Sequence, residues 1–311
     1  MGVELVQERW KGKLYTLTIG REPNQVTVGG DSTLPFLDLD GGTYSRPVSA
    51  LTVLDQRPEN WPDTLAGAWG DVLDDPVKWA QRCVELGADA VVLRLISAHP
   101  ERGDRSPAEC AATAKAVAEA IDRPLIVLGC SVDEKDAAVL PVVAEALNGY
   151  NCLIGQATSE NYKTVVAGCL AHGHSVIATS PLDINLAKQL NILMTDMNLP
   201  PERIAMDPSI GPLGYGIEYA YSIIERKRTG ALLGDRMLAV PVICLVGEEA
   251  WKVKEAQTTD GPEWGADEPR GVLWEAVTAA SLAQAGASIF VFQHPEALRQ
   301  FSLQIDALMG K

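Results

Sequence analysis

The residues that could do chemistry gather where an apolar segment, Ile204–Met206, runs into a polar turn. Asp207 opens the turn, and Pro208 after it cannot donate a hydrogen bond to a sheet, so a strand would end there. The other candidates of this turn are Ser209, Gly211, Gly214, Tyr215 and Gly216. Asp207 could act as a general acid, accept hydrogen bonds from a ligand, or only cap its own loop. Polar residues on a glycine-rich loop after a buried strand are typical of ligand sites in α/β proteins.

A second group of candidates lies at the ends of other apolar segments. Its members carry hydroxyl, amide or carboxyl groups, and they are Thr158, Asn161, Tyr162, Ser180, Asp183 and Asn185. The sequence has no Ser–His–Asp order that stands out, no HExxH, and no glycine-rich loop with a phosphate-binding Lys. Residues 158–162 could equally be no more than the start of a helix. Such a polar set, poor in charge pairs, suits binding of a large organic ligand better than cleavage of a bond.

The elements that must position these residues alternate along the chain. Apolar strands are predicted over 48–55, 88–97, 124–131, 151–158, 175–181, 204–209, 237–247 and 288–294, and a helix follows each. Nearly continuous apolar strands indicate a parallel sheet that is buried on both faces. The predicted fold is therefore of the α/β class: a (β/α)8 TIM barrel over residues 48–311, with its functional face at the carboxyl ends of the strands. An open doubly wound sheet is the alternative, but no GxGxxG follows the first strand.

Residues 1–47 precede this repeat and are predicted to form a separate N-terminal extension. Leu14–Gly20 and Gln25–Gly30 alternate apolar and polar residues, and the Pro23-Asn24 pair between them favours a turn. The pattern predicts a β-hairpin. One interpretation is a lid over the N-terminal end of the barrel, and the other is a docking element for a second subunit.

Composition and charge exclude several classes of function. With 26 Lys and Arg against 41 Asp and Glu, the formal net charge is −15, which argues against nucleic acid and anionic membranes as partners. The N-terminus carries scattered charges and no apolar core segment, so no signal peptide is predicted. The longest apolar run, near Met237–Val246, is too short to span a bilayer. We therefore expect a cytoplasmic protein.

The six cysteines show no metal-binding pattern. None belongs to a CxxC pair, and their spacings resemble no zinc or iron–sulfur ligand set, so we expect them to be reduced and structural. The tryptophans predicted to lie outside the barrel are Trp61, Trp69, Trp251, Trp264 and Trp274. Buried ones would be ordinary packing, whereas exposed ones would indicate a protein interface.

Several long strings of this sequence are similar to those of one known family. They are DPSIGPLGYGIEYAYSIIER, SPLDINLAKQLNILMTDMNLP, PVICLVGEEAWKVKEA, QATSENYK and LWEAVTA. Together they strongly resemble the small (delta) subunit of the corrinoid iron–sulfur protein of the carbon monoxide dehydrogenase/acetyl-CoA synthase system. The resemblance covers nearly the whole chain from Gly29 onward. Two positions depart from the family pattern, since Thr179 and Gln293 stand where its members tend to carry Arg.

The resemblance implies a TIM barrel that pairs with a larger subunit, which carries an iron–sulfur cluster and a corrinoid-binding domain. The corrinoid (a cobalamin) would lie at the interface, shared with this chain, which would hold no cluster of its own. The heterodimer would carry a methyl group, loaded by a methyltransferase from methyl-tetrahydrofolate or a related pterin. Delivery to acetyl-CoA synthase would place it in the Wood–Ljungdahl pathway, with the methyltransferase and the synthase as transient partners. In that role the chain is a non-catalytic subunit.

A second hypothesis stays open beside this one. Pterin-dependent methyltransferases use related barrels, so the chain could itself be a stand-alone enzyme of that kind. Asp207, Asn161 and Asn185 would then hold the pterin ring.

Overall fold

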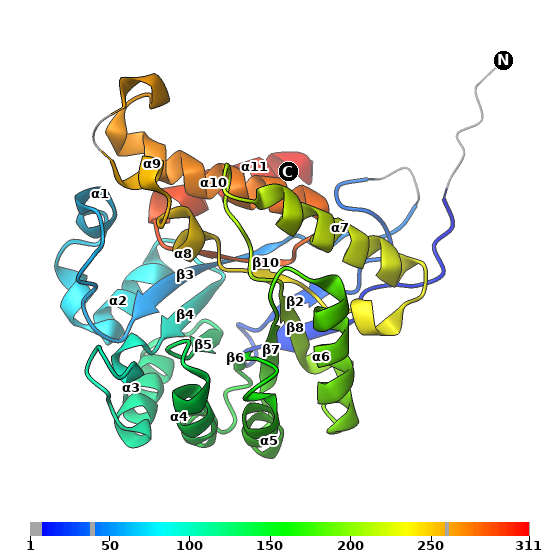
Figure 1. The fold of residues 1–311 in the computed structure, drawn as a ribbon, viewed down its shortest axis with the longest axis horizontal. Coiled ribbons are helices and arrows are strands. Elements are labelled where there is room, and N and C mark those ends of the chain that lie inside the picture. Colours follow the sequence, from blue (N-terminus) through cyan, green and yellow to red (C-terminus); the bar gives the residue numbers. More distant parts are fainter. Residues whose placement is uncertain (1–7, 38–40, 259–260, 311) are drawn as a thin grey trace.

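Eight parallel strands form a nearly closed barrel surrounded by helices in the computed structural model, which describes residues 8–37, 41–258 and 261–310 (Figure 1). The strands are β3 (Val48–Leu54), β4 (Ala90–Arg94), β5 (Leu125–Leu128), β6 (Leu153–Ala157), β7 (Ser175–Thr179), β8 (Ile204–Asp207), β9 (Ile243–Cys244) and β10 (Ile289–Phe292). Each of the first five pairs with the next along the chain, and β10 lies between β9 and β3. A single parallel bridge, Met206 to Val242, joins β8 to the segment before β9. The predicted (β/α)8 barrel is confirmed.

Helices cover the outside of the barrel between successive strands. They are α1 (Asp63–Gly67), α2 (Pro76–Glu85), α3 (Pro107–Ala120), α4 (Asp133–Ala146), α5 (Tyr162–His172), α6 (Ile184–Asp196), α7 (Ile217–Leu232), α8 (Val246–Ala250), α9 (Lys254–Gln257), α10 (Asp267–Ala285) and α11 (Pro295–Leu308). The sequence marks some starts clearly: Ser106 and Glu109 form a capping box at α3. No helix among the described residues is both long and apolar enough to cross a membrane.

The strand before α8 is much shorter than the sequence predicts. Only Ile243–Cys244 pair as β9, while residues 236–238 form a turn of 3-10 helix. Pro241 has no N–H to donate, and its carbonyl accepts from the backbone of Met206 instead. The following stretch contains α8 and α9, which line one side of a cleft at the barrel mouth.

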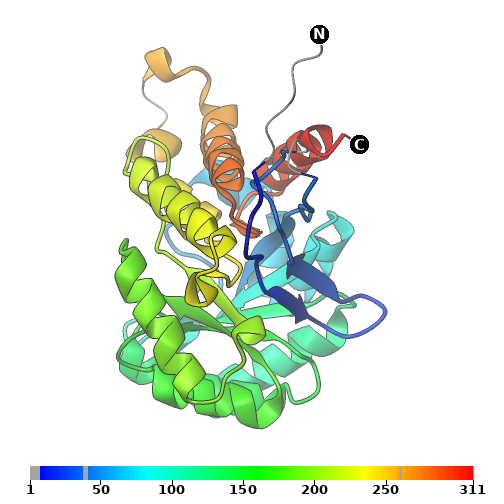
Figure 2. The same ribbon diagram turned by 90° about the vertical axis from the view of Figure 1, so that its right-hand side faces the viewer.

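The N-terminal hairpin forms as predicted and packs against the amino ends of the barrel strands (Figure 2). Strands β1 (Thr16–Ile19) and β2 (Val26–Gly29) are antiparallel. Leu17, Ile19 and Val28 belong to the same buried cluster as the inward-facing residues of the barrel, such as Val48 and Leu153. The hairpin therefore closes the N-terminal end of the barrel. A chain division at residue 47 stays a prediction.

A buried ion pair fastens the segment after the hairpin to α7. Arg228 donates to Asp31 over 2.9 Å and to the carbonyl of Thr33 over 2.9 Å, and both charged side chains are almost wholly buried. The neighbouring Lys227 is also buried and donates to the carbonyl of Val240. Burial, together with the charge of Arg228, lowers the pKa of Lys227 to about 7.

Candidate functional site

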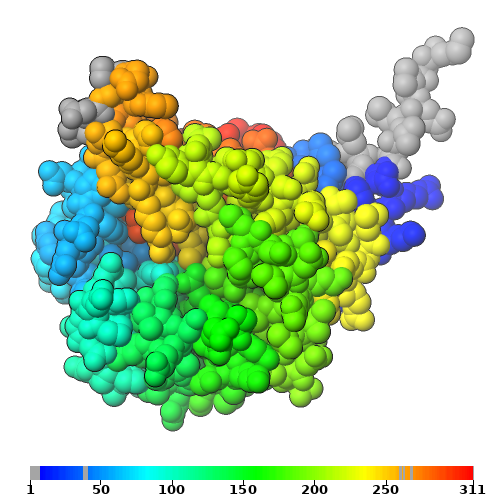
Figure 3. Space-filling view, in the orientation of Figure 1, coloured from blue at the N-terminus to red at the C-terminus, as the bar shows by residue number. Residues whose placement is uncertain are grey.

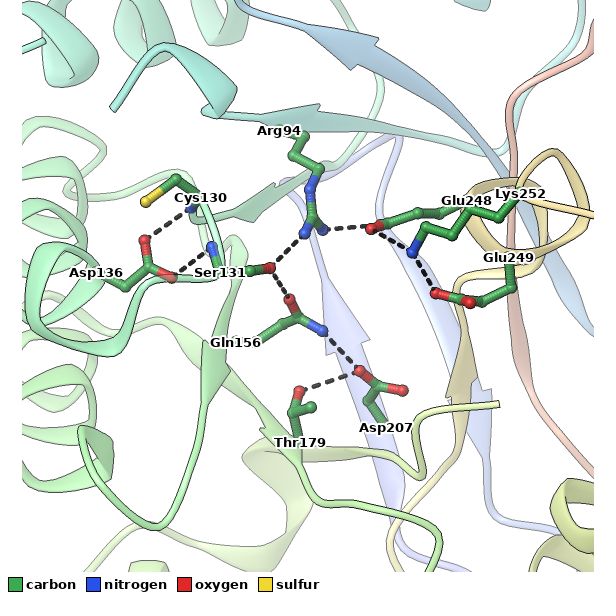
Figure 4. A network of polar contacts seen from close by, with 10 residues as sticks. All are labelled: Arg94, Cys130, Ser131, Asp136, Gln156, Thr179, Asp207, Glu248, Glu249 and Lys252. Atoms are coloured by element: carbon green, nitrogen blue, oxygen red, sulfur yellow. Dashed lines mark hydrogen bonds and ion pairs between the residues drawn. The ribbon is translucent and has the colours of Figure 1, made fainter. Parts of the chain in front are cut away.

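A chain of hydrogen bonds crosses the carboxyl ends of the strands in the middle of the barrel mouth (Figure 4). Arg94 Nη2 donates to Ser131 Oγ over 2.5 Å, and Ser131 Oγ donates to Gln156 Oε1 over 3.3 Å. Gln156 Nε2 then donates to Asp207 Oδ2 over 2.9 Å, and Thr179 Oγ1 donates to the same oxygen over 3.1 Å. Side chains from five βα segments thus meet at one place, which we call the mouth network.

Strand alternation places most of these side chains inside the barrel. Arg94 lies on the same side of β4 as Ala90 and Val92, which belong to the interior cluster. Asp207 likewise lies on the same side of β8 as Ala205, which belongs to the same interior cluster. Gln156 follows a break in that alternation, because the pairing of β6 with β7 shifts register between Ile154 and Ala157.

Asp207 is held as an acceptor rather than left free as a base. Its Oδ1 accepts from the backbone N of Ser209 over 3.0 Å, while its Oδ2 accepts from Gln156 and Thr179. Burial raises the pKa of Asp207, and these donors oppose that rise by stabilising the carboxylate. Since both oxygens are occupied, Asp207 has little capacity left for general-base chemistry.

One side of the mouth is charged. Arg94 Nη1 pairs with Glu248 over 3.0 Å, and Lys252 Nζ lies 3.4 Å from Glu248 and 2.8 Å from Glu249. Burial opposes ionisation of Glu248, but Arg94 and Lys252 outweigh it and hold the pKa of Glu248 below its usual value. A cleft of about 330 Å³ lies beside this group, between the β3–α1 loop and the α8–α9 segment (Figure 3). Trp61 forms part of its lining.

The β5–α4 turn aims Ser131 into the network. Both carboxylate oxygens of Asp136 accept backbone N–H groups, from Cys130 over 2.7 Å and from Ser131 over 3.0 Å. A Cβ at position 129 would lie 2.2 Å from Asp136, so only Gly129 allows this approach. Burial and the nearby Asp136 raise the pKa of the Cys130 thiol to about 12, which removes it as a nucleophile at neutral pH.

The buried carboxylate of Glu275 supports the rim of the mouth near β10 and α8 from outside the barrel. Glu275 of α10 accepts from the backbone N of Gln293 over 2.6 Å and from Trp251 Nε1 over 2.7 Å. Its burial raises its pKa to about 8. His294 stacks on Trp251 and accepts from the backbone N of Glu296 through Nδ1. It therefore caps α11.

Three residues predicted from the sequence, Ser180, Asp207 and Ser209, lie together at the mouth. Ser209 Oγ donates to the carbonyl of Ser180 over 2.8 Å, and Ser209 N bonds to Asp207. Ser180 is 4% exposed, and its Oγ makes no hydrogen bond to any described residue. A buried hydroxyl without a protein partner is costly, so Ser180 Oγ is a group that a bound ligand could satisfy.

Thr158, Asn161 and Tyr162 shape the start of α5 instead. Asn161 Oδ1 accepts from the backbone N of Thr158 over 2.9 Å, and Thr158 Oγ1 donates to Asp133 over 2.8 Å. The Tyr162 ring lies under Lys163 Nζ at 5.9 Å. The polar groups of Asn161 and Thr158 thus bond within their own turn and to Asp133 at the start of α4.

The remaining predicted residues lie at loops and helix starts. Asp183 caps α6 by accepting from the backbone N of Asn185 over 2.7 Å, and both residues are exposed. Tyr215 is 52% exposed and donates through its hydroxyl to Glu255 over 2.7 Å. The glycines of this loop are Gly211, Gly214 and Gly216. Gly216 precedes α7 with φ of 99°, which favours glycine. Among the described residues, Asp183 and Tyr215 bond elsewhere than to the mouth network, so the role of this set in binding stays a prediction.

Sequence reasoning gave no binding role to Arg94, Ser131, Gln156, Thr179 or Glu248, although Thr179 stood out as a departure from the family pattern. A signal was available for two of them, because Arg94 and Gln156 interrupt otherwise apolar strands. A charged or amide side chain within a buried strand must find a partner inside the barrel. The described residues contain no group of three or more His, Cys, Asp or Glu that could hold a metal ion.

Solved structures with a similar fold are dihydropteroate synthases. The enzyme from Coxiella burnetii, in complex with pteroic acid, matches with a TM-score of 0.59 and 14% identity, over 94% of this chain and 99% of that one. The enzyme from Yersinia pestis, bound to a pterine–sulfa conjugate, matches with a TM-score of 0.58 and 16% identity, over 90% and 100%. At such low identity the likeness shows the fold alone.

Comparison of sequences shows the family as well as the fold. Residues 16–298 match the family model of the CO dehydrogenase/acetyl-CoA synthase delta subunit. Subunit delta of the acetyl-CoA decarbonylase/synthase complex of Archaeoglobus fulgidus is 34% identical over 99% of this chain and 71% of its own length. The subunit from Methanosarcina mazei is 35% identical over 94% of this chain and 68% of its own length. The chain belongs to the family of the CO dehydrogenase/acetyl-CoA synthase delta subunit.

Proposed function

We propose that this chain is the small subunit of a heterodimeric corrinoid iron–sulfur methyl carrier. In this role the barrel mouth holds a corrinoid that is shared with a larger partner subunit, which carries the iron–sulfur cluster. A methyltransferase loads the methyl group from a methyl-pterin, and acetyl-CoA synthase receives it. The chain itself is a binding subunit rather than the catalyst.

The observation that carries the proposal is the self-contained mouth network. Its hydroxyl, amide and carboxylate groups satisfy one another, and Asp207 has both oxygens occupied. The cysteines are all buried, and the pKa of Cys130 is raised, so a thiolate nucleophile is not provided there. A preformed polar surface without an activated nucleophile suits binding of a large ligand better than bond cleavage.

The residues of the mouth fit the periphery of a corrinoid. Corrin rings carry amide side chains, which need hydrogen-bond donors and acceptors. Ser180 Oγ is buried without a partner, and Gln293 lines the neighbouring cleft. Ser180 and Gln156 would hold such amides, and Trp251 and Trp61 would offer apolar surface. The corrinoid supplies the cobalt that accepts and releases the methyl group, and this chain's side chains position it.

The test is purification of the chain with its partners from the native source, followed by cobalt and iron analysis and a visible spectrum. We expect stoichiometric cobalt and iron together with a second, larger chain. A colourless preparation of this chain alone, with neither metal, would overturn the proposal.

A pair of matched variants tests the position of the ligand. Ser180→Val fills the place of the buried hydroxyl with a methyl group, whereas Asn185→Ala changes an exposed side chain at the start of α6. We expect the cobalt-to-protein ratio to fall at least several-fold in Ser180→Val and to stay unchanged in Asn185→Ala. Equal ratios in both variants would contradict binding at Ser180.

A pterin-dependent methyltransferase is the second candidate function. Similar structures include dihydropteroate synthases solved with pteroic acid, and Asp207 lies in the barrel mouth. A pterin ring N–H would have to replace Gln156 or Thr179 as a donor to Asp207. Of the other residues predicted to hold a pterin, Asn161 bonds through its side chain to the backbone of Thr158, and Asn185 is exposed at the start of α6. Methyl transfer from a methyl-pterin by the isolated chain would favour this candidate over the first.

A further inference from the structure

Large apolar side chains are exposed very unevenly around the barrel. Among the described residues, helices α2 to α5 together expose one, Val142 of α4, at 36%. The region of α7, α10 and the turns before them exposes five, which are Tyr215 (52%), Tyr219 (62%), Trp264 (52%), Leu273 (48%) and Val277 (44%). We call these five residues the α7–α10 face. Clustered exposed apolar residues of this kind mark interaction sites more often than scattered ones do.

The members of this face belong to one continuous surface. Trp274 Nε1 donates to the carbonyl of Leu213 over 2.8 Å, which ties the β8–α7 loop to α10. The ring of Trp264 packs edge-on against that of Trp274 at 6.0 Å. Tyr215 reaches α9 through its bond to Glu255. Helix α10 packs against α7 and also against α8 and α9, so these segments lie along one edge of the molecule (Figure 1).

Helix α10 carries no charge on its outer side over most of its length. Between Val272 and Ala285 the only charged residue is Glu275, and Glu275 is fully buried. The outward positions are Leu273, Val277, Ser281 and Gln284. A helix that faces water normally places charged residues on its outer side, so this pattern is that of a helix covered by another protein.

A cleft extends the same surface at the far end of α10. It measures about 370 Å³ and lies between the segment after the hairpin, α7 and the ends of α10 and α11. Its lining includes Phe36, Leu37, Tyr221 and Leu308, which are largely apolar. A cleft of this kind can receive an anchoring side chain of a partner.

The charges around the face argue against a second copy of this chain as the occupant. The exposed or half-exposed charged residues near it are Glu218, Glu225, Glu255, Glu263, Arg226 and Lys254, so carboxylates are in excess. A symmetric dimer would bring this excess against itself in two chains of net charge −15 each. A different chain with Lys or Arg around an apolar centre avoids the repulsion.

We propose that the α7–α10 face is the docking surface for a different, larger protein chain whose contact surface is apolar with a basic rim. The inference rests on the proposed function, which supplies such a chain as the cluster-bearing subunit. The mouth network and the docking surface would then lie on adjoining sides of the molecule, so that one partner reaches both.

The experiment compares three forms of the tagged chain, each expressed in the native source and purified with its bound partners. Leu273→Glu/Val277→Glu places two carboxylates on the face, and Val142→Glu places one on the control helix α4. Native mass spectrometry gives the stoichiometry and identity of the second chain, and elemental analysis gives cobalt and iron. Circular dichroism checks that each variant is folded.

We expect wild type and Val142→Glu to retain one equivalent of a larger chain with basic residues. The amount of this chain that co-purifies with Leu273→Glu/Val277→Glu should be at least ten-fold lower. Full retention by the double variant, with cobalt and iron present, would overturn the docking surface but leave the proposed function intact. A homodimer in wild type would also overturn it. In a further outcome, wild type binds a basic partner that carries no cobalt or iron, and the double variant loses this partner. That outcome would support the docking surface and count against the proposed function.

Footprinting gives a second readout that needs no substitution. Hydroxyl radicals should oxidise Trp264 and Tyr219 several-fold more slowly in the purified complex than in the isolated chain, because the partner covers them. Tyr150, half-buried beside the hairpin at the amino-terminal end of the barrel, serves as the comparison. Equal oxidation of Trp264 and Tyr219 in both states would contradict docking at this face.

Discussion

The mouth network and the ion pair behind α7 are both polar clusters inside the protein, but they are built differently. At the mouth, the links run through Ser131, Gln156 and Thr179, whose hydroxyl and amide groups can both donate and accept. Behind α7, the guanidinium of Arg228 donates to Asp31 and to a backbone carbonyl, and a guanidinium cannot accept.

This difference separates a binding surface from a structural fastening. If one group of the mouth changes, Gln156 can turn its amide and Ser131 can rotate its hydroxyl, so the remaining bonds can form again. The pair Arg228–Asp31 has no such freedom, since loss of either partner leaves a charge buried and unpaired. We therefore expect large stability effects behind α7 and small ones at the mouth.

The largest effect should come from Arg228→Met. The substitution keeps much of the side-chain volume but leaves Asp31 buried without its cation, which costs about 3–5 kcal/mol in the free energy of unfolding. Urea denaturation at neutral pH measures the change. The double variant with Asp31→Asn should recover part of the loss. A loss below about 1 kcal/mol in the single variant would show that the cluster is not the fastening we describe.

Lys227 should make stability depend on pH. Its pKa is about 7 in the folded protein and near 10.5 when unfolded, so between these values the unfolded chain holds the extra proton. The unfolding free energy therefore rises with pH in this window, by up to about 1.4 kcal/mol per pH unit from this group. Lys227→Met should remove that slope. Parallel urea titrations from pH 7 to 8.5 give the comparison, and identical slopes in both proteins would contradict it.

Asp207→Asn should have a smaller effect on stability than on binding. The mouth network can reverse its donors around the new amide, so we expect a loss of about 1 kcal/mol. The cobalt-to-protein ratio of the purified complex should nevertheless fall, because the groups offered to the ligand change. A loss as large as that of Arg228→Met would mean that the mouth is as rigid a structural element as the ion pair behind α7.

Arg299→Ala provides the lower limit of the series. Arg299 pairs with Glu296 on the exposed side of α11, where the side chain is 61% exposed. Exposed pairs contribute little, so the midpoint of thermal unfolding should move by less than about 2 °C. A larger shift would indicate that surface pairs, and not only buried ones, set the stability of this barrel.

The sequence by itself determined the repeat, the hairpin and the family. Apolar runs such as Val48–Leu54 and a capping box such as Ser106–Glu109 are local signals, because strand burial and helix capping depend on neighbouring residues. Asp207 and Ser209 were found in the same way, since a polar turn after an apolar strand is visible in the chain order. The short β9 was missed because the apolar run continues past Pro241.

Only the tertiary structure decided which polar residues meet. Gln156 enters the mouth through a register shift in β6, and Arg94 finds Glu248 across the barrel, a contact between residues far apart in the sequence. Asn161 and Asn185 carry suitable groups, but the Asn161 side chain bonds within its own turn and Asn185 is exposed at the start of α6. The exposure of Leu273 and Val277 likewise depends on how α10 packs between its neighbours. Residue type is written in the sequence, whereas direction and exposure follow from the packing of distant segments.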